Sequence, residues 1–449
     1  MKKLEIKKDI LNGNISQQIL LITVPICGTY LLQQLYQFVD FIVLGRYAGV
    51  EAMAAVGGSA SMILNNLVNI VIGLATGLMV LVAQSYGRHN SERVTETVKT
   101  GMFIAIVFGG VISLLVAFFS KPLLVLMNCP AEIIRPSLIY MYLYLAGVIP
   151  YAIYTFGMYV LRATGDTKIS GFFTIIIAVV KIVLDILLTA ILKIGVWGVA
   201  ISTFASYLVC GIVVLIILNK TYDSYHYSLK NFGFDLNIMK EIFRVGIPIA
   251  IQSTVFTITN ALMSVKINVY GTNVVAAFTA YNNVDNFFWS FSNAIGCAIL
   301  TIVGQNYGNK NMERVKETFK KGIIIHTIVT IIITVLVIKF GYQLLTLFTT
   351  DKQVLDIAYK ALSTYAKAYF SYILIEIVSA TIKGCGDATN SMIIAIIGIC
   401  VVRIAYLELF PLNSLNNVLA CYPLSWSISS AIFLIYFLIN KKYKSTKNN

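Results

Sequence analysis

Long apolar blocks recur along the whole of this 449-residue sequence, and they limit its fold more than any other feature. Each block is roughly 20 residues or more, the length at which an α-helix crosses a hydrocarbon core of about 30 Å. A helix on the surface of a soluble protein would instead show an apolar stripe with a polar back. Apolar residues make up 58% of the chain and charged residues 12%, which are too few charges to cover a soluble surface. The sequence therefore predicts an all-α polytopic membrane protein.

The blocks predict twelve transmembrane helices and leave little chain for a separate domain. They lie near residues 16–45, 56–85, 96–119, 134–161, 170–192, 195–218, 242–270, 276–306, 319–345, 358–382, 391–411 and 416–440. The sequence has no GxGxxG, no Walker glycine loop, no CxxC and no His–Cys grouping at metal-ligand spacing. We therefore expect no enzyme, no cofactor and no bound metal.

The net charge of +14 would suggest nucleic-acid binding in a soluble chain, but the position of the basic residues argues against it. Most lysines and arginines fall in the segments that are cytoplasmic if the N-terminus is cytoplasmic. This distribution predicts a protein of the cell membrane with both termini on the cytoplasmic side. The terminal basic clusters would then lie beside anionic lipid headgroups. These clusters are Lys2, Lys3, Lys7, Lys8 and Lys441, Lys442, Lys444, Lys447.

A duplication divides the chain into two halves. Residues 82–94 (VAQSYGRHNSERV) match residues 303–315 (VGQNYGNKNMERV), and residues 161–170 (LRATGDTKIS) match residues 382–391 (IKGCGDATNS). Both pairs are separated by the same 221 positions. Each half holds six predicted spans, an even number, so the halves are expected to be parallel repeats related by an axis along the membrane normal.

The repeat predicts a transporter built of two six-helix bundles. The N-terminal lobe would comprise residues 1–218, a basic cytoplasmic linker residues 219–241, and the C-terminal lobe residues 242–449. We expect most of the repeated residues to have structural roles. Gly87 and Gly308 suit left-handed helix C-caps. The aspartates at positions 166 and 387 could cap the following helices, while Arg93 should face water.

Charged residues inside spans are expensive in a bilayer, at roughly 2.5–3.5 kcal/mol each, and so need a partner or a function. Counting helix rise from the span ends places Asp40, Asp185 and Thr203 in one layer on three helices of the first half. Such a group could hold a small cation or share a proton, or it could be three unrelated polar residues. Lys181 precedes Asp185 by four residues, so the two lie on one helix face as an ion pair or as a device that keeps Asp185 ionised.

The second half carries its own charged residues. Asp285 and Arg403 lie at similar depth and could pair, and Glu376 is a secondary functional candidate without a partner on its own helix. Lys266 and Glu408 are close enough to helix ends to extend toward the membrane surface.

Polar side chains also gather in the first, second, seventh and eighth spans, where they would be costly against lipid and should face a cavity. Aromatic rings among them suit organic cations. The candidate substrate-cavity residues are Gln34, Tyr36, Gln37, Asn66, Asn69, Gln252, Asn282 and Asn283.

These features together resemble the multidrug and toxic compound extrusion (MATE) family over nearly the whole chain. The resemblance implies two six-helix bundles arranged as a V, and alternating-access antiport that exports amphipathic, often cationic drugs in exchange for H+ or Na+. It also implies that Asp40, Asp185 and Thr203 form the cation site. The motifs that carry it are the paired QxYG and GD sequences, the VD and LD dipeptides at the two aspartates, and the RIAYLELFP and YPLSW stretches.

The sequence departs from the family pattern at three positions. Lys181 stands where many members have asparagine, and its ammonium would repel Na+, so H+ is favoured as the coupling ion. Phe256 and Tyr372 stand at two positions where a subgroup has acids, with Glu376 one turn after the second. A lipid or oligosaccharide-lipid flippase of the same superfamily is the alternative function, and a channel or membrane enzyme is disfavoured. We expect a monomer with a small-molecule substrate.

Overall fold

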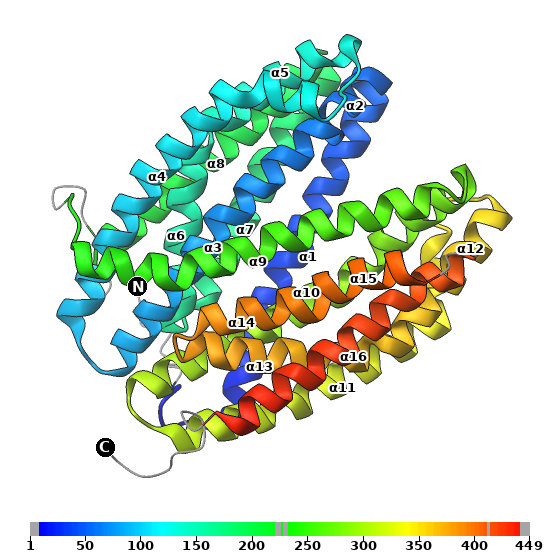
Figure 1. Cartoon of the computed structure of the whole chain (residues 1–449). Coiled ribbons are helices and arrows are strands. Elements are labelled where there is room, and N and C mark those ends of the chain that lie inside the picture. Colours follow the sequence, from blue (N-terminus) through cyan, green and yellow to red (C-terminus); the bar gives the residue numbers. More distant parts are fainter. Residues whose placement is uncertain (1–8, 221–225, 228–231, 411–413, 441–449) are drawn as a thin grey trace. The chain divides into compact units, whose positions relative to one another are not determined.

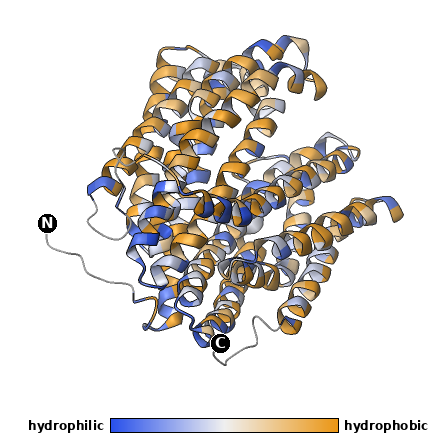
Figure 2. Ribbon diagram, turned by 60° about the vertical axis from the view of Figure 1, so that its left-hand side comes forward, coloured by the Kyte–Doolittle hydropathy of each residue, from blue (hydrophilic) through white to orange (hydrophobic). Residues whose placement is uncertain are grey.

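The computed structural model describes residues 9–220, 226–227, 232–410 and 414–440, which are almost entirely helical and contain no strand (Figure 1). The predicted basic clusters at both termini lie outside the described residues, as does part of the predicted linker. Hydrophobic residues dominate the helices along their length (Figure 2).

Ten helical segments among the described residues are long and apolar enough to cross a membrane. Several are interrupted by π-helical turns (η). In chain order they are α1 (Ile15–Val43) with η1 (Leu44–Ala48); α2 (Val50–Gly57) with α3 (Ser59–Gly87); α4 (Ser91–Leu126); α7 (Thr167–Asp185) with η2 (Ile186–Ile191); α8 (Val196–Lys220); α9 (Leu236–Asn268); α10 (Thr272–Gly308); α11 (Met312–Leu345); α14 (Ala388–Ala395) with η5 (Ile396–Val401) and α15 (Val402–Leu409); and α16 (Leu415–Ile439).

The span predicted at 134–161 is a bent pair, α5 (Ala131–Ala146) and α6 (Val148–Thr164), which meet at 48°. Pro150 explains the bend, because it has no N–H to donate to the carbonyl four residues earlier and its ring crowds the preceding turn. With this pair counted as one span, the described residues hold eleven.

The remaining predicted span, near 358–382, falls on α12 (Lys352–Ala368), a 3₁₀ turn η4 (Tyr369–Tyr372) and α13 (Ile373–Gly384). This segment is helical but broken in the middle, and α12 carries four charged side chains. They are Lys352, Asp356, Lys360 and Lys367. All three pieces contact neighbouring long helices of the second half, so the segment belongs to the helical bundle despite its polar start.

The described chain forms two compact units. The N-terminal unit is Gly28–Ala250, and the C-terminal unit combines Met1–Cys27 with Ile251–Asn449. The divisions fall inside α1 and α9, so each of these helices contributes to both units. The lobe boundaries that we predicted from the linker at 219–241 stay a prediction.

Small residues bring the start of α9 into the N-terminal unit. A Cβ atom added to Gly77 would lie 2.6 Å from the carbonyl oxygen of Ile242, and one added to Gly73 would lie 2.5 Å from the backbone nitrogen of Ala250. Gly246 would meet the Cα of Leu74 at 2.8 Å. Pairs of small residues four positions apart let two membrane helices approach this closely.

The repeated arginines anchor the segments that lead into α1 and α9. Arg93 donates two hydrogen bonds to the Glu241 carboxylate, at 2.9 and 2.7 Å, rather than simply facing water as predicted. Its counterpart Arg314 donates to the carbonyl oxygens of Ile10 and Gly13 at 3.1 and 2.7 Å. The two copies of the motif therefore do the same work, one in each unit.

The expected glycine C-caps are displaced along the chain. Gly87 and Gly308 end their helices without a positive φ, and the left-handed residues are His89 (φ 55°) and Lys310 (φ 58°), two positions later. The chain turns there after one further α-like residue, so a non-glycine takes the left-handed position.

Glycines do take this role in the second repeated motif. Gly165 and Gly386 have φ of 88° and 84°. Asp166 and Asp387 follow them at N-cap positions, but neither side chain makes the predicted capping hydrogen bond. Asp387 instead accepts a hydrogen bond of 2.6 Å from the Tyr436 hydroxyl, so its carboxylate joins two helices of the C-terminal unit.

Candidate functional site

Four predicted site residues meet in one cluster inside the N-terminal unit. Asp40 comes from α1, Lys181 and Asp185 from the second half of α7, and Thr203 from α8. The Lys181 Nζ atom lies 2.9 Å from Asp40 Oδ2, 3.3 Å from Asp185 Oδ2 and 3.0 Å from Thr203 Oγ1. The sequence placed these oxygens at one depth, and the structure places the lysine between them.

The cluster is shielded from solvent. Asp185 is fully buried and Lys181 is 3% exposed, while 19% of the Asp40 side chain is exposed. Ser202 is a further member that the sequence analysis missed, because it donates a hydrogen bond to Asp185 Oδ1 and lies 3.5 Å from Lys181 Nζ. The signal in the sequence was its place beside Thr203, because both of these hydroxyl residues of α8 contact Lys181 of α7.

Asp40 is the member of the cluster with an oxygen that can still accept a hydrogen bond. Its Oδ1 atom is buried and has no hydrogen-bond partner among the residues that the structure describes. Asp40 lines a cavity of about 190 Å³, whose lining includes four tyrosines. These are Tyr36, Tyr140, Tyr144 and Tyr207. A carboxylate oxygen beside a polar cavity can accept a proton or contact a cation.

The charges of the cluster do not cancel. One ammonium faces two carboxylates, so the ionised cluster carries one net negative charge, and a single proton would neutralise it. Burial makes that residual charge costly. The lysine ammonium also occupies the position between Asp40, Asp185 and Thr203 where a small cation would otherwise be coordinated. The arrangement therefore holds a positive charge between the oxygens and leaves a carboxylate oxygen of Asp40 that could accept a proton.

The predicted substrate-cavity residues of the first half are only partly brought together. Tyr36 and Gln37 line the same cavity as Asp40, whereas Gln34, Asn66 and Asn69 are not part of its described lining. Asn66 donates to the carbonyl of Met62 at 2.8 Å, which is one turn back on its own helix.

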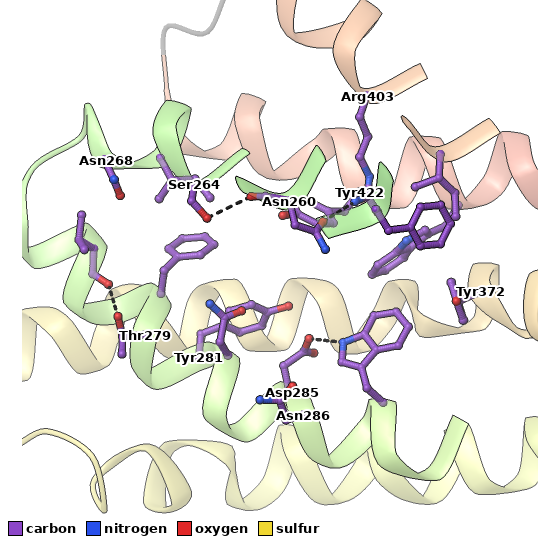
Figure 3. Close-up of a pocket in the computed structure, with 18 of the residues that line it drawn as sticks. Asn260, Ser264, Asn268, Thr279, Tyr281, Asp285, Asn286, Tyr372, Arg403 and Tyr422 are labelled. Atoms are coloured by element: carbon purple, nitrogen blue, oxygen red, sulfur yellow. Dashed lines mark hydrogen bonds between the residues drawn. The ribbon is translucent and has the colours of Figure 1, made fainter. Parts of the chain in front are cut away.

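A larger cavity, of about 600 Å³, lies inside the C-terminal unit (Figure 3). Asn282 lines it as predicted, whereas Gln252 and Asn283 are not part of its described lining. Asn283 donates to the carbonyl of Thr279 instead. Phe256 and Tyr372, which stand at the two positions where a subgroup of the family has acids, both line it. The charged residues of this cavity lie at other positions.

Asp285 and Arg403 are the charged residues of this cavity, but they do not form the ion pair that their depth suggested. The Asp285 carboxylate accepts from Trp289 Nε1 at 2.6 Å and from the Tyr369 hydroxyl. Arg403 is held by other neutral groups, and Figure 3 shows the two side chains on different walls. Aromatic and amide partners have taken the place of a direct salt bridge.

Three other charged candidates of the second half each contact neighbouring protein groups. Glu376 packs against the backbone of α10, where a Cβ atom on Gly296 would collide with its carboxylate. Glu376 is not among the described residues that line the C-terminal cavity. Lys266 and Glu408, predicted to extend toward the surface, form an exposed ion pair of 3.4 Å.

The sequence analysis missed one buried arginine. Arg162 is 3% exposed and lies over the rings of Tyr30 and Tyr159, at 5.5 and 5.2 Å from their centroids. It sits just past the end of the predicted span, but the 221-residue offset pairs it with Lys383 and could have revealed it.

All three π-helical turns in the described chain lie close to a charged residue of the N-terminal cluster or of the C-terminal cavity. η1 begins four residues after Asp40, η2 follows directly after Asp185, and η5 ends two residues before Arg403. Such turns re-aim side chains within a helix and are frequent at functional sites. These turns support a functional role for both cavities.

Comparison with known proteins decides the family. The family model for MatE matches residues 25–187 and 248–407, one copy in each half. The chain belongs to the MatE family. The two matches correspond to the duplication and include Asp40, Asp185 and Arg403.

Relatives of the MatE chain carry a consistent description. It is 26% identical over 447 residues to the probable multidrug resistance protein YoeA of Bacillus subtilis, with 95% of this chain and 94% of that one covered. It is 26% identical to the probable multidrug resistance protein NorM of Thermotoga maritima, with 87% and 84% covered. It is thus similar to membrane transporters and not to enzymes, as the sequence predicted.

A solved structure shares the fold. This is the outward-facing conformation of a multidrug resistance MATE family transporter of the MOP superfamily, with a TM-score of 0.91 and 21% identity. The alignment covers 99% of this chain and 100% of the other. The chain therefore shares this fold, and its MatE family makes it a multi-pass membrane transporter.

Proposed function

We propose that this chain is a secondary active antiporter that exports amphipathic, cationic organic compounds in exchange for protons. The observation that carries the proposal is the Lys181 ammonium, held within 3.3 Å of oxygens from Asp40, Asp185 and Thr203. An ammonium at the centre of a carboxylate site leaves room for a proton but repels a sodium ion.

Coupling would follow from differential proton binding between two states of the transporter. Protonation of Asp40 or Asp185 from outside removes the residual negative charge, loosens the hold on Lys181 and lets α1, α7 and α8 repack. Drug is then released outward. Deprotonation on the cytoplasmic side restores the cluster and resets the transporter. Alternating access of a monomer with both termini in the cytoplasm is part of this proposal.

The test is efflux of a cationic dye from vesicles that contain the purified protein. A pH gradient and a Na+ gradient are imposed separately, with the membrane potential clamped. We expect a pH gradient alone to drive dye movement and a Na+ gradient at uniform pH to drive none. Dye movement that follows Na+ alone would refute the proton mechanism, and a dye flux that ignores both gradients would refute antiport.

A further inference from the structure

The C-terminal cavity holds two buried charges of opposite sign that do not neutralise each other. Asp285 is 6% exposed and Arg403 is 5% exposed, and both line the same cavity of about 600 Å³. Removing two ions from water costs several kcal/mol each unless a partner compensates. Since no ion pair of either residue occurs in the described part of the chain, compensation by a protein charge is absent there.

Each charge is instead kept in place by neutral groups. Both oxygens of Asp285 accept hydrogen bonds, from the indole N–H of Trp289 and the hydroxyl of Tyr369, which suits the ionised carboxylate. Tyr369 is itself fixed, because its ring stacks on Phe288 at 3.7 Å with an interplanar angle of 3°. These neutral donors orient the Asp285 carboxylate without neutralising its charge.

Arg403 is oriented in the same manner. Its Nε donates to Ser425 Oγ and its Nη1 to Asn260 Oδ1, both at 3.0 Å, and its guanidinium lies 4.3 Å from the centroid of the Tyr422 ring. A guanidinium has five N–H donors. Two are used in these contacts, and the planar group remains able to bind a carboxylate along its Nη edge.

The N-terminal cavity provides an internal comparison. There the cation and the carboxylates touch, as Lys181 contacts both Asp40 and Asp185 within 3.3 Å, and one net negative charge remains when both acids are ionised. In the C-terminal cavity the Asp285 carboxylate and the Arg403 guanidinium lie on different walls (Figure 3). In the proposed function the first arrangement takes up a proton. The second leaves a carboxylate and a guanidinium that can each bind an opposite charge of a ligand.

The walls of the cavity indicate what kind of molecule lies between those charges. Trp289 packs edge-on against Tyr372 at 4.8 Å and against Trp426 at 5.8 Å, and all three line the cavity. Aromatic walls suit a flat organic body, and the volume falls in the range of small-molecule sites, about 300–1,000 Å³.

We propose that the C-terminal cavity binds zwitterionic amphipathic compounds, with the ligand's carboxylate on Arg403, its cationic group on Asp285 and its aromatic body against Trp289. The proposal rests on the proposed export function and deepens it, because it assigns recognition of a ligand's carboxylate to Arg403 and of its cationic group to Asp285. A ligand with both groups satisfies both buried charges, whereas a purely cationic ligand leaves the guanidinium without a counter-charge.

Two dyes that differ by one functional group test this. Rhodamine B carries a delocalised cation and a free carboxylate at neutral pH, and its ethyl ester keeps the cation and the aromatic body but has no carboxylate. Binding to the full-length protein in detergent is measured by fluorescence anisotropy. We expect wild-type protein to bind rhodamine B about tenfold more tightly than the ester, since a hydrogen bond to a charged group accounts for a difference of that size.

Variants assign the preference to the two residues. Arg403→Gln should weaken rhodamine B binding about tenfold and leave the ester unchanged, so the ester reports that the protein is folded. Asp285→Asn should weaken both dyes to a similar extent. Lys339→Gln and Asp356→Asn are the matched controls, because both side chains lie on exposed positions of the same unit.

Equal affinity of the wild type for the two dyes would overturn the proposal, as would an Arg403→Gln variant that loses both dyes alike. The experiment is independent of transport. A failure of proton coupling would appear only in the vesicle assay, whereas a failure of this site would appear only in the ratio of the two affinities.

Discussion

At the scale of single residues, Lys181 decides how the N-terminal cluster behaves. Its ammonium contacts Asp40, Asp185 and Thr203, so it stabilises two buried carboxylates and at the same time fills the space between them. A neutral side chain at this position would leave the oxygens free to coordinate a metal ion.

The variant Lys181→Asn is therefore expected to increase the response to Na+. An amide oxygen replaces a charge that lies close to the site, so the apparent affinity for Na+ in vesicle efflux should rise by at least about tenfold. Lys193→Asn is the control, because Lys193 is exposed and its φ of 54° is one that asparagine adopts readily. An unchanged Na+ response in Lys181→Asn would reduce Lys181 to a structural ion pair.

Residue type and depth along a helix predicted the charged members of the N-terminal cluster and Thr203, because charged groups in a membrane need partners, but they missed Ser202. They were not enough for the C-terminal cavity. Asp285 and Arg403 have matching depths, but the rotation of their helices directs them to Trp289, Tyr369 and Asn260 instead. Rotation about a helix axis depends on tertiary packing, which spacing alone does not contain.

At the scale of elements, the close contact between α3 and α9 depends on residues without side-chain bulk. Gly73 and Gly77 face Gly246 and Ala250, and the backbones approach until a single Cβ atom would collide. This contact brings the first turns of α9 into the N-terminal unit, a division that the hydropathy pattern did not predict because α9 reads as one continuous apolar block.

We predict that Gly77→Ala destabilises the protein by about 1–3 kcal/mol, because the new methyl group meets backbone atoms that cannot move aside easily. Gly110→Ala, whose Cβ would lie 3.6 Å from a flexible Ile149 methyl, should be neutral or slightly stabilising. Thermal unfolding in detergent measures both. Equal unfolding temperatures for the two variants would show that α3 and α9 are not tightly packed.

The breaks inside two of the spans could not be predicted from the hydropathy pattern. Most spans were found by their length and apolar content, but the segment near 358–382 contains a 3₁₀ turn and a charged first helix, and the segment near 134–161 bends at Gly147 and Pro150. Breaks of this kind depend on which backbone groups neighbouring helices satisfy, and hydropathy averages across them.

At the scale of the whole molecule, the distribution of basic residues predicts the orientation in the membrane. Lysines and arginines concentrate in alternate loops and in both terminal segments. A green fluorescent protein fused after Asn449 should therefore be fluorescent, and an alkaline phosphatase fused at the same place should be inactive. Active phosphatase at this position would place the C-terminus outside and reverse the orientation.

The duplication gives the two units similar frames but different charged cavities. The first holds a compact cluster with one residual negative charge, and the second holds a carboxylate and a guanidinium apart. In our account the first senses protons and the second binds part of the substrate. Removing the acid in one cavity should therefore affect coupling, and removing the acid in the other should affect binding.

The most direct measurement of the central claim is dye efflux driven by a pH gradient in vesicles that contain Asp40→Asn, compared with wild type and with the exposed control Asp356→Asn. Dye binding in detergent is measured on the same preparations. The account predicts that Asp40→Asn keeps binding dye but loses gradient-driven efflux to near the level of empty vesicles, while the control matches wild type. Undiminished efflux in Asp40→Asn would contradict it, because the acid beside Lys181 would then have no part in coupling.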